Sequence, residues 1–181
     1  MGVHMNATSL ARLDSYLTES LAELFAAHGM TGVSHRDEIS ARDGDFAAAI
    51  GFVGERIKGA LILSLGRASL VASFPENLRR KGASDEMLAD WGGELANQLL
   101  GRLKNGLWSS GVEIALGTPV AFVGEELEHF SPDPMIIRRK AFVMETGKAV
   151  AELEIDCAAD LELGEPKESF EGLAGGEFSL F

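Results

Sequence analysis

The stretch SDEMLADWGGELANQLLGRLKNGLWSSG, residues 84–111, decides how the rest of the chain is arranged, and it has the pattern of a long helix. Ser84 is a favourable N-cap residue. Asp85 and Glu86 follow in the first turn, where the helix dipole favours acidic side chains. Small and apolar residues then recur at spacings of three and four, which predicts a face buried against a core. This stripe consists of Leu88, Gly92, Leu95, Ala96, Leu99, Leu103 and Leu107.

The opposite face of this helix carries polar residues. At about 100° per residue, Asp90, Glu94, Asn97, Gly101 and Lys104 project away from the buried stripe. Glu94 and Asn97 are neighbours on that face, one turn apart. A glycine inside a helix costs about 1 kcal/mol relative to alanine, so Gly101 suggests close approach of another backbone. Because polar residues are usual on an outer helix face, an acid and an amide at this spacing are by themselves a weak functional signal.

The segments around this helix alternate between helix and strand patterns. The N-terminal segment has a helical apolar spacing, with Thr8 or Ser9 as the expected cap and Gly29 as the expected end. The order of elements predicts an α+β domain: a mostly antiparallel sheet of about six strands with two long helices packed on it. Strands are expected at 30–41, 46–53, 57–65, 112–123, 135–145 and 148–157, and a short helix at 67–74.

Two segments far apart in the chain resemble each other. Residues 52–60, FVGERIKGA, are similar to residues 142–150, FVMETGKAV. With the repeated order of one helix followed by three strands, this similarity suggests two related halves that share one sheet. Within the last expected strand, Glu152 and Glu154 fall on a face that we expect to be mostly solvated.

Composition limits the classes of function. The chain has 181 residues, of which 46% are hydrophobic, and a net charge of −12. Since phosphate-backbone binding needs clustered cations, nucleic acid is not an expected partner, and neither is an anionic membrane surface. A single cysteine, Cys157, fits a reducing compartment. No apolar run approaches the roughly 20 residues of a membrane-spanning helix. We therefore expect a soluble, cytoplasmic protein.

The chain divides into one domain and a tail. The alternating patterns occupy residues 8–158, and residues 159–181 are acidic and rich in glycine. Tails have such a composition, but apolar residues within this one suggest that it docks on the domain or on a neighbouring chain. The four histidines lack metal-ligand spacing, and no Ser/His/Asp arrangement could be assembled. No metal or cofactor is therefore expected on this chain.

The helix and the strand that follows it resemble the CheX/CheC family of chemotaxis phosphatases. The similarity rests on Gly93-Glu94-Leu95-Ala96-Asn97, on Gly101 and Lys104, and on Gly117-Thr118-Pro119-Val120 in the following strand segment. It extends from about Leu10 to Cys157 and implies a CheC-like fold with pseudo-twofold halves.

CheC-type members carry two such helices. When Gly32-Val33 is aligned with Gly111-Val112, the first helix of this chain has Ser15 and Thr18 at the positions of Glu94 and Asn97. This half therefore has no second site. A single site per chain resembles the CheX branch, which implies homodimers joined through their sheets.

The resemblance also implies a function. The substrate would be a CheY-type response regulator phosphorylated on aspartate, whose own receiver domain supplies Mg²⁺. Asn97 would orient the attacking water, and Glu94 would bind the lysine of the receiver. Gly101 would let the receiver approach, and Asp90 and Lys104 would contact it.

Two other functions fit the sequence. The first is a non-catalytic module of the same fold, which binds a receiver domain or another partner and forms dimers. The second is a domain that senses a small ligand, which would require a pocket.

Overall fold

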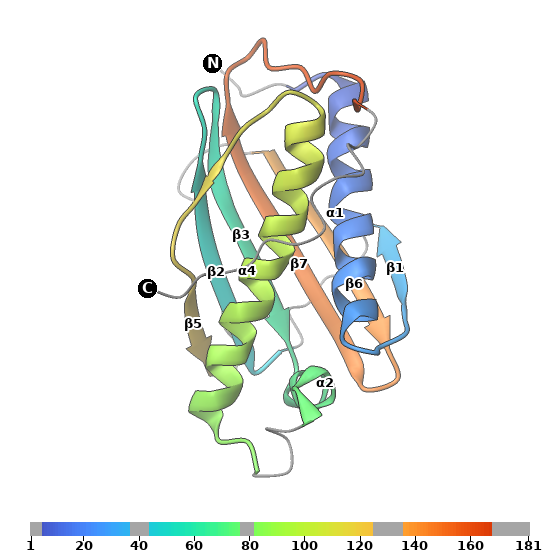
Figure 1. The fold of residues 1–181 in the computed structure, drawn as a ribbon, viewed down its shortest axis with the longest axis vertical. Coiled ribbons are helices and arrows are strands. Elements are labelled where there is room, and N and C mark those ends of the chain that lie inside the picture. The colour runs from blue at the N-terminus through green and yellow to red at the C-terminus, as the bar shows by residue number, and fades with distance from the viewer. Residues whose placement is uncertain (1–4, 37–43, 77–81, 125–135, 168–181) are drawn as a thin grey trace.

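The protein is built on one antiparallel sheet of seven strands. The computed structural model describes residues 5–36, 44–76, 82–124 and 136–167. The strands follow the order β1-β6-β7-β3-β2-β4, and β5 also pairs with β2. The long helices α1 and α4 lie on one face of the sheet (Figure 1). The elements are α1 (Ala7–Ala27), β1 (Val33–Arg36), β2 (Phe46–Val53), β3 (Ile57–Leu65), α2 (Arg67–Ser73), α4 (Asp85–Ser109), β4 (Ala115–Leu116), β5 (Val120–Val123), β6 (Ile136–Met144) and β7 (Gly147–Cys157).

The predicted α+β class with an antiparallel sheet is confirmed. One expected strand, at 112–123, is divided into the short strands β4 and β5, with Gly117, Thr118 and Pro119 between them. Both pieces pair with β2 at the sheet edge. The division follows from the chemistry of proline, which has no N–H to donate to a strand partner.

The two similar segments form equivalent hairpins. In the first hairpin Val53 pairs with Lys58, and in the second Val143 pairs with Lys148. β3 pairs along its whole length with β7 in the middle of the sheet. Each half places its first strand beside the hairpin of the other half, because β1 pairs with β6 and β5 pairs with β2. The expected pair of related halves is therefore visible in the strand pairing.

The start of α1 differs from the prediction. Its N-cap is Asn6, whose Oδ1 accepts a hydrogen bond of 2.8 Å from the backbone N–H of Ser9. The prediction of Thr8 or Ser9 as the cap was wrong by two or three residues. Asparagine is as good a cap as serine, and Ser9 has another role, because its hydroxyl accepts from the backbone N–H of Leu163.

Both long helices end in the same way. Gly29 and Gly111 have positive φ angles of 72° and 85°. The backbone N–H of the following residue reaches back to close each helix, from Met30 to Phe25 O at 3.0 Å and from Val112 to Leu107 O at 2.9 Å. These are Schellman motifs, which favour glycine because its left-handed backbone costs little.

The equivalent ends correct the alignment of the two helices. Matching Gly29 with Gly111 places Arg12 opposite Glu94 and Ser15 opposite Asn97. The earlier alignment, through Gly32 and Gly111, paired other residues because it ignored the helix ends. In either alignment α1 lacks a second acid-and-amide pair.

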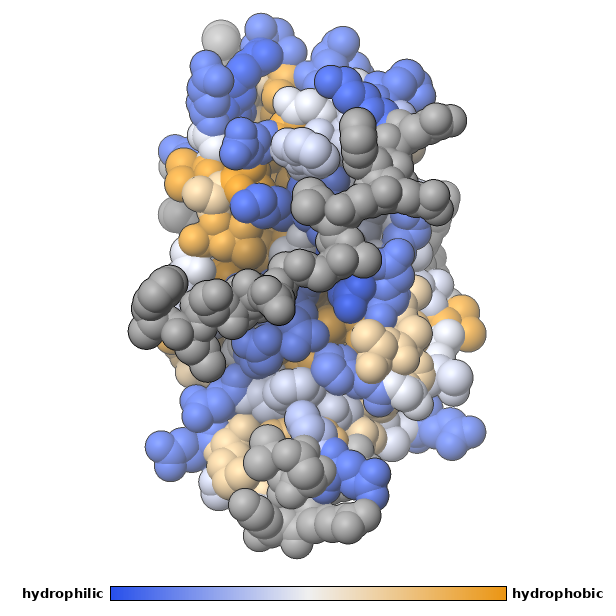
Figure 2. All heavy atoms as spheres, in the orientation of Figure 1, coloured by the Kyte–Doolittle hydropathy of each residue, from blue (hydrophilic) through white to orange (hydrophobic). Residues whose placement is uncertain are grey.

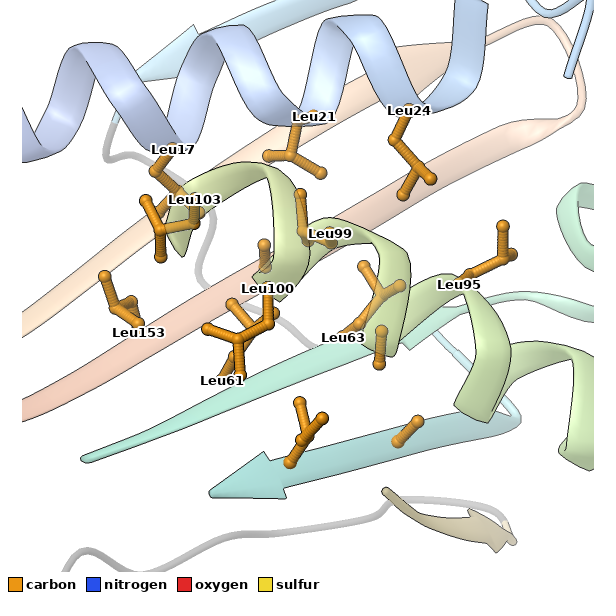
Figure 3. Packing of buried hydrophobic residues seen from close by; sticks show 14 of the residues in the cluster. Leu17, Leu21, Leu24, Leu61, Leu63, Leu95, Leu99, Leu100, Leu103 and Leu153 are labelled. Atoms are coloured by element: carbon orange, nitrogen blue, oxygen red, sulfur yellow. The ribbon is translucent and has the colours of Figure 1, made fainter. Parts of the chain in front are cut away.

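Leucine side chains fill the space between the helices and the sheet (Figure 3). The predicted stripe of α4 is buried as expected, and Leu100 joins it. Burying each such side chain contributes about 1.5–3 kcal/mol, so this layer holds α4 in a fixed rotation about its axis. The labelled members of the cluster are Leu17, Leu21, Leu24, Leu61, Leu63, Leu95, Leu99, Leu100, Leu103 and Leu153.

The far face of β7 is less solvated than expected. Glu152 and Glu154 are only 3% and 4% exposed. Arg139, on the neighbouring strand β6, donates from Nε to Glu152 Oε2 over 2.6 Å. The expectation of a wet face was wrong here, and for Glu152 the reason is its ion pair with Arg139 on the neighbouring strand.

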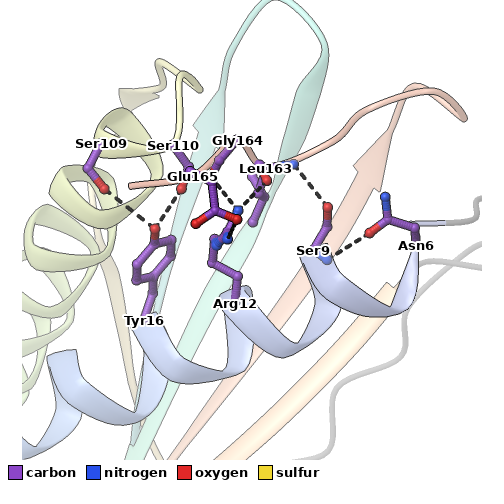
Figure 4. Close-up of polar contacts among 9 residues, drawn as sticks. All are labelled: Asn6, Ser9, Arg12, Tyr16, Ser109, Ser110, Leu163, Gly164 and Glu165. Carbon is purple, nitrogen blue, oxygen red and sulfur yellow. Dashed lines mark hydrogen bonds and ion pairs between the residues drawn. The ribbon is translucent and has the colours of Figure 1, made fainter. Parts of the chain in front are cut away.

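Residues 161–167, which we name the strap, lie along α1 (Figure 4). Leu161 and Leu163 are buried. Arg12 Nη1 donates to Leu163 O at 2.5 Å, and the strap also pairs with the end of α4, where Gly164 N–H donates to Ser110 O at 3.0 Å. This part of the expected tail therefore packs on the domain. Residues 168–181 of that tail lie outside the described residues.

Candidate functional site

Glu94 and Asn97 lie on the side of α4 that faces away from the core. Glu94 is exposed and Asn97 is half-buried. Between them, Leu95 and Ala96 are fully buried and fix the rotation of this part of the helix. The acid and the amide therefore occupy one accessible face, one turn apart, as the helical spacing predicts.

The amide of Asn97 remains available for an external group. None of the described residues forms a hydrogen bond with its side chain. A carboxamide can donate through its nitrogen and accept through its oxygen. It can therefore bind a water molecule in a defined orientation without taking up or losing a proton.

Glu94 is held by neighbours that the sequence prediction did not include. Its Oε1 accepts a hydrogen bond of 2.9 Å from Gln98 Nε2. The other end of the same amide, Gln98 Oε1, lies 3.1 Å from His28 Nε2 on α1. The spacing of four residues between Glu94 and Gln98 is a helical pairing signal. The contact with His28 joins distant parts of the chain and has no such signal.

Gly93 and Pro119 are brought together by the fold. A methyl group placed on Gly93 would lie 3.8 Å from the Pro119 Cβ. The helix motif and the Gly-Thr-Pro segment, which are far apart in the sequence, are thus in contact beside the site. Gly101 differs, since a methyl group there would meet no described atom within 4 Å. Packing within the described part of the chain therefore does not require this glycine.

The remaining predicted contact residues divide into two groups. Asp90 is exposed one turn before Glu94. Lys104 is partly buried and lines a cavity of about 590 Å³ at the end of the β2–β3 hairpin. Charged residues from several segments share this cavity, namely Glu55, Arg56, Glu113 and Glu162. The structure therefore gives Lys104 an environment different from that of the other four predicted residues.

The two tryptophans of α4 have different environments. Trp91 donates from Nε1 to Ser73 Oγ at 3.1 Å, and its ring meets the edge of Phe74. Trp108 is 63% exposed. The described residues therefore leave its ring largely unpacked.

No cluster of metal-binding side chains occurs within the part of the chain that the structure describes. The acidic residues Glu125, Glu126 and Glu128 lie outside that part. Within the same part, none of the helices combines the length and the apolar character needed to cross a membrane.

Several solved structures of chemotaxis proteins have the same fold. A CheC-like superfamily protein from Shewanella sp. PV-4 is 23% identical, with a TM-score of 0.61 over 84% of this chain and 99% of that one. The chemotaxis protein CheX from Vibrio vulnificus is 21% identical, with a TM-score of 0.60 over 84% and 99%. The Borrelia burgdorferi CheX–CheY–BeF3–Mg²⁺ complex contains a chain that is 14% identical, with a TM-score of 0.57 over 81% and 97%.

The sequence itself assigns the family. No curated protein matches the chain. The family model described as chemotaxis phosphatase CheX matches residues 46–158, which is more than half of the chain and includes both Glu94 and Asn97. The chain therefore belongs to the CheX family of chemotaxis phosphatases.

Proposed function

We propose that this protein hydrolyses the aspartyl phosphate of a CheY-type response regulator. A water oxygen attacks phosphorus, and the bond from phosphorus to the aspartyl oxygen breaks. The aspartate of the receiver and inorganic phosphate are released, and a proton of the water remains with the phosphate or passes to solvent. The observation that carries this proposal is the amide of Asn97, which is accessible and has no hydrogen-bond partner among the described residues, one turn from an exposed carboxylate.

Asn97 is proposed to orient the attacking water. An acyl phosphate is already reactive, so the main requirement is a water in line with the bond that breaks. Positioning of this kind supplies much of the rate in phosphoryl transfer. A neutral amide suits the task because it binds water through both a donor and an acceptor. The role needs no nucleophile on this chain.

Glu94 is proposed to bind the lysine of the receiver and to set the register of docking. A carboxylate and an ammonium form a charge-assisted hydrogen bond, which favours correct orientation. The receiver would contribute the Mg²⁺ ion, which neutralises charge on the phosphoryl group. The complex of a structurally similar Borrelia protein with CheY, BeF3 and Mg²⁺ supports a receiver as the partner.

Phosphate release from a phosphorylated receiver tests this function. We expect Asn97→Ala to lower kcat by about 100-fold while receiver binding stays nearly unchanged. Glu94→Ala should instead weaken binding. Asn105→Ala is the matched control, because Asn105 is an exposed asparagine on the same helix, and it should keep wild-type turnover.

The same assay separates the enzyme from a non-catalytic binding module. Equal phosphate-release rates with wild-type protein and Asn97→Ala would overturn the proposed role of the amide. If stoichiometric protein never shortens the lifetime of the phosphorylated receiver, yet the two proteins co-elute, the binding module is the correct function.

We also propose that two copies join at a sheet edge. Apolar side chains are exposed beside β2, namely those of Val53, Val120, Phe122 and Val123. Figure 2 shows hydrophobic residues gathered at the upper left of the view, near the end of β2 that leads into the hairpin with β3. Patches of this kind mark association surfaces. Analytical ultracentrifugation should give a dimer mass, and a monomer at all concentrations tested would exclude this arrangement.

A further inference from the structure

We infer that Gln98 and His28 are positioning residues that hold the Glu94 carboxylate ready for the incoming lysine. This inference rests on the proposed docking role of Glu94 and extends it to two residues with no assigned role. Its basis is a chain of two hydrogen bonds, from His28 to Gln98 at 3.1 Å and from Gln98 to Glu94 at 2.9 Å.

The chemistry of the three groups determines the direction of both bonds. An ionised carboxylate can only accept hydrogen bonds, so Gln98 must turn its NH₂ toward Glu94. Its carbonyl oxygen then faces His28, as the contact atoms show. His28 must therefore donate from Nε2, and its hydrogen bond locks the orientation of the amide.

The His28 ring is itself fixed in place. It meets the ring of Trp91 edge-on, with centroids 5.0 Å apart and an interplanar angle of 86°. Trp91 is held in turn by the hydroxyl of Ser73 in α2. The backbone of His28 belongs to the closed end of α1, where its N–H donates to Phe25 O. Three helices thus determine where Gln98 points.

The arrangement leaves Glu94 able to bind a partner. Gln98 uses Oε1 alone, and a carboxylate has about four acceptor positions on its two oxygens. None of the described residues bonds to Oε2, which leaves this oxygen for a cation from outside. Because a long side chain loses rotamer freedom on binding, prior ordering of Glu94 lowers the entropic cost of docking. The expected effect is on affinity, with no effect on the chemical step.

The test compares two substitutions of His28, one that keeps an aromatic ring and one that keeps an N–H donor. His28→Phe keeps an aromatic ring beside Trp91 but has no N–H to donate. His28→Gln keeps an N–H donor near the position of Nε2. We expect His28→Phe and Gln98→Ala to raise KM for the phosphorylated receiver about threefold to tenfold with kcat unchanged. His28→Gln should restore the wild-type KM.

A second readout needs no receiver. In ¹⁵N relaxation measurements, the order parameter of the Gln98 side-chain amide should fall in His28→Phe and return in His28→Gln. An unchanged order parameter and KM in His28→Phe would overturn the inference, as would a fall in kcat at constant KM. If the wild-type protein lacks phosphatase activity, the proposed function fails. The order parameter and the affinity for the receiver treated with beryllium fluoride and Mg²⁺ then still decide whether these residues position Glu94.

Discussion

The outer faces of α1 and α4 differ, although the two helices end in the same motif and occupy equivalent places in their halves. On α1, Arg12 binds carbonyl oxygens of the strap and pairs with Glu165 at 2.8 Å. At the equivalent position on α4, Glu94 is exposed and bonds only to its neighbour Gln98 among the described residues. The outer face of α1 therefore forms bonds within the protein, whereas the outer face of α4 keeps polar side chains accessible to a partner.

The two helices also meet the sheet differently. α1 places Asp14 against two cations of β6, with hydrogen bonds from Arg138 Nε at 2.7 Å and an ion pair with Lys140 at 3.3 Å. α4 meets the sheet through leucines. The comparison teaches that polar side chains with partners inside the protein stabilise the fold. A functional site instead needs polar side chains that remain accessible to another molecule. Substitutions of Arg12 and Asp14 on α1 should therefore change stability, and substitutions of Glu94 and Asn97 on α4 should change activity.

The largest expected effect on stability is that of Asp14→Ala. Lys140 is completely buried and Asp14 is 16% exposed. Removing the carboxylate takes a counter-charge from this buried cation, and we expect the free energy of unfolding to fall by about 3 kcal/mol. Urea unfolding measures the change. Glu94→Ala is the control on α4 and should stay within about 0.5 kcal/mol of wild type. Equal losses in the two variants would contradict the comparison.

Two glycines of α4 allow the same comparison between a position packed against α1 and an open position. A methyl group on Gly106 would lie 2.8 Å from Cγ of the Tyr16 ring on α1, whereas one on Gly101 would meet no described atom within 4 Å. Gly106→Ala should therefore cost about 1–3 kcal/mol through overpacking. Gly101→Ala should stabilise the protein by up to about 1 kcal/mol and weaken receiver binding. Thermal unfolding and a binding titration measure the two effects, and destabilisation by Gly101→Ala would contradict the assignment.

A smaller effect is expected when the strap is loosened. Arg12→Ala removes the hydrogen bond to Leu163 O and the ion pair with Glu165. Because both contacts lie near the surface, we expect a loss of about 1 kcal/mol. Hydrogen exchange should become faster at the Leu163 and Gly164 amides, and turnover should not change. A large loss of phosphatase activity would show that the strap supports the site.

The last prediction concerns pH. Burial raises the pKa of Asp14, but the hydrogen bond from Arg138 and the charges of Lys140 and Arg138 outweigh it and hold this pKa below the ordinary value of 3.8. A lowered pKa in the folded state stabilises the protein above pH 3.8, and this contribution is lost as the pH falls from there through the folded-state pKa. Asp14→Asn should therefore lack this contribution, so its free energy of unfolding should fall less than that of wild type as the pH drops below 3.8. Parallel pH dependence in wild type and variant would refute it.

Several features could be predicted because they are local. The hairpin boundaries followed from turn residues, and the buried side of α4 followed from spacing, since helix geometry fixes which residues share a face. The N-cap of α1 was missed because Asn6, Thr8 and Ser9 are all suitable caps. The alignment of the two halves was wrong because it matched Gly32 with Gly111, although the glycine that ends α1 with a positive φ is Gly29.

The sequence by itself determined the order of elements, the antiparallel class, and the placement of Glu94 and Asn97 on one helical face. Each of these depends on spacings of a few residues. Only the tertiary structure decided that His28 reaches Gln98, that Arg12 is bound by the strap and that Asp14 faces Lys140. The physical reason is that a hydrogen bond needs its two atoms within about 3 Å. For residues far apart in the chain, packing of the helices on the sheet sets that distance.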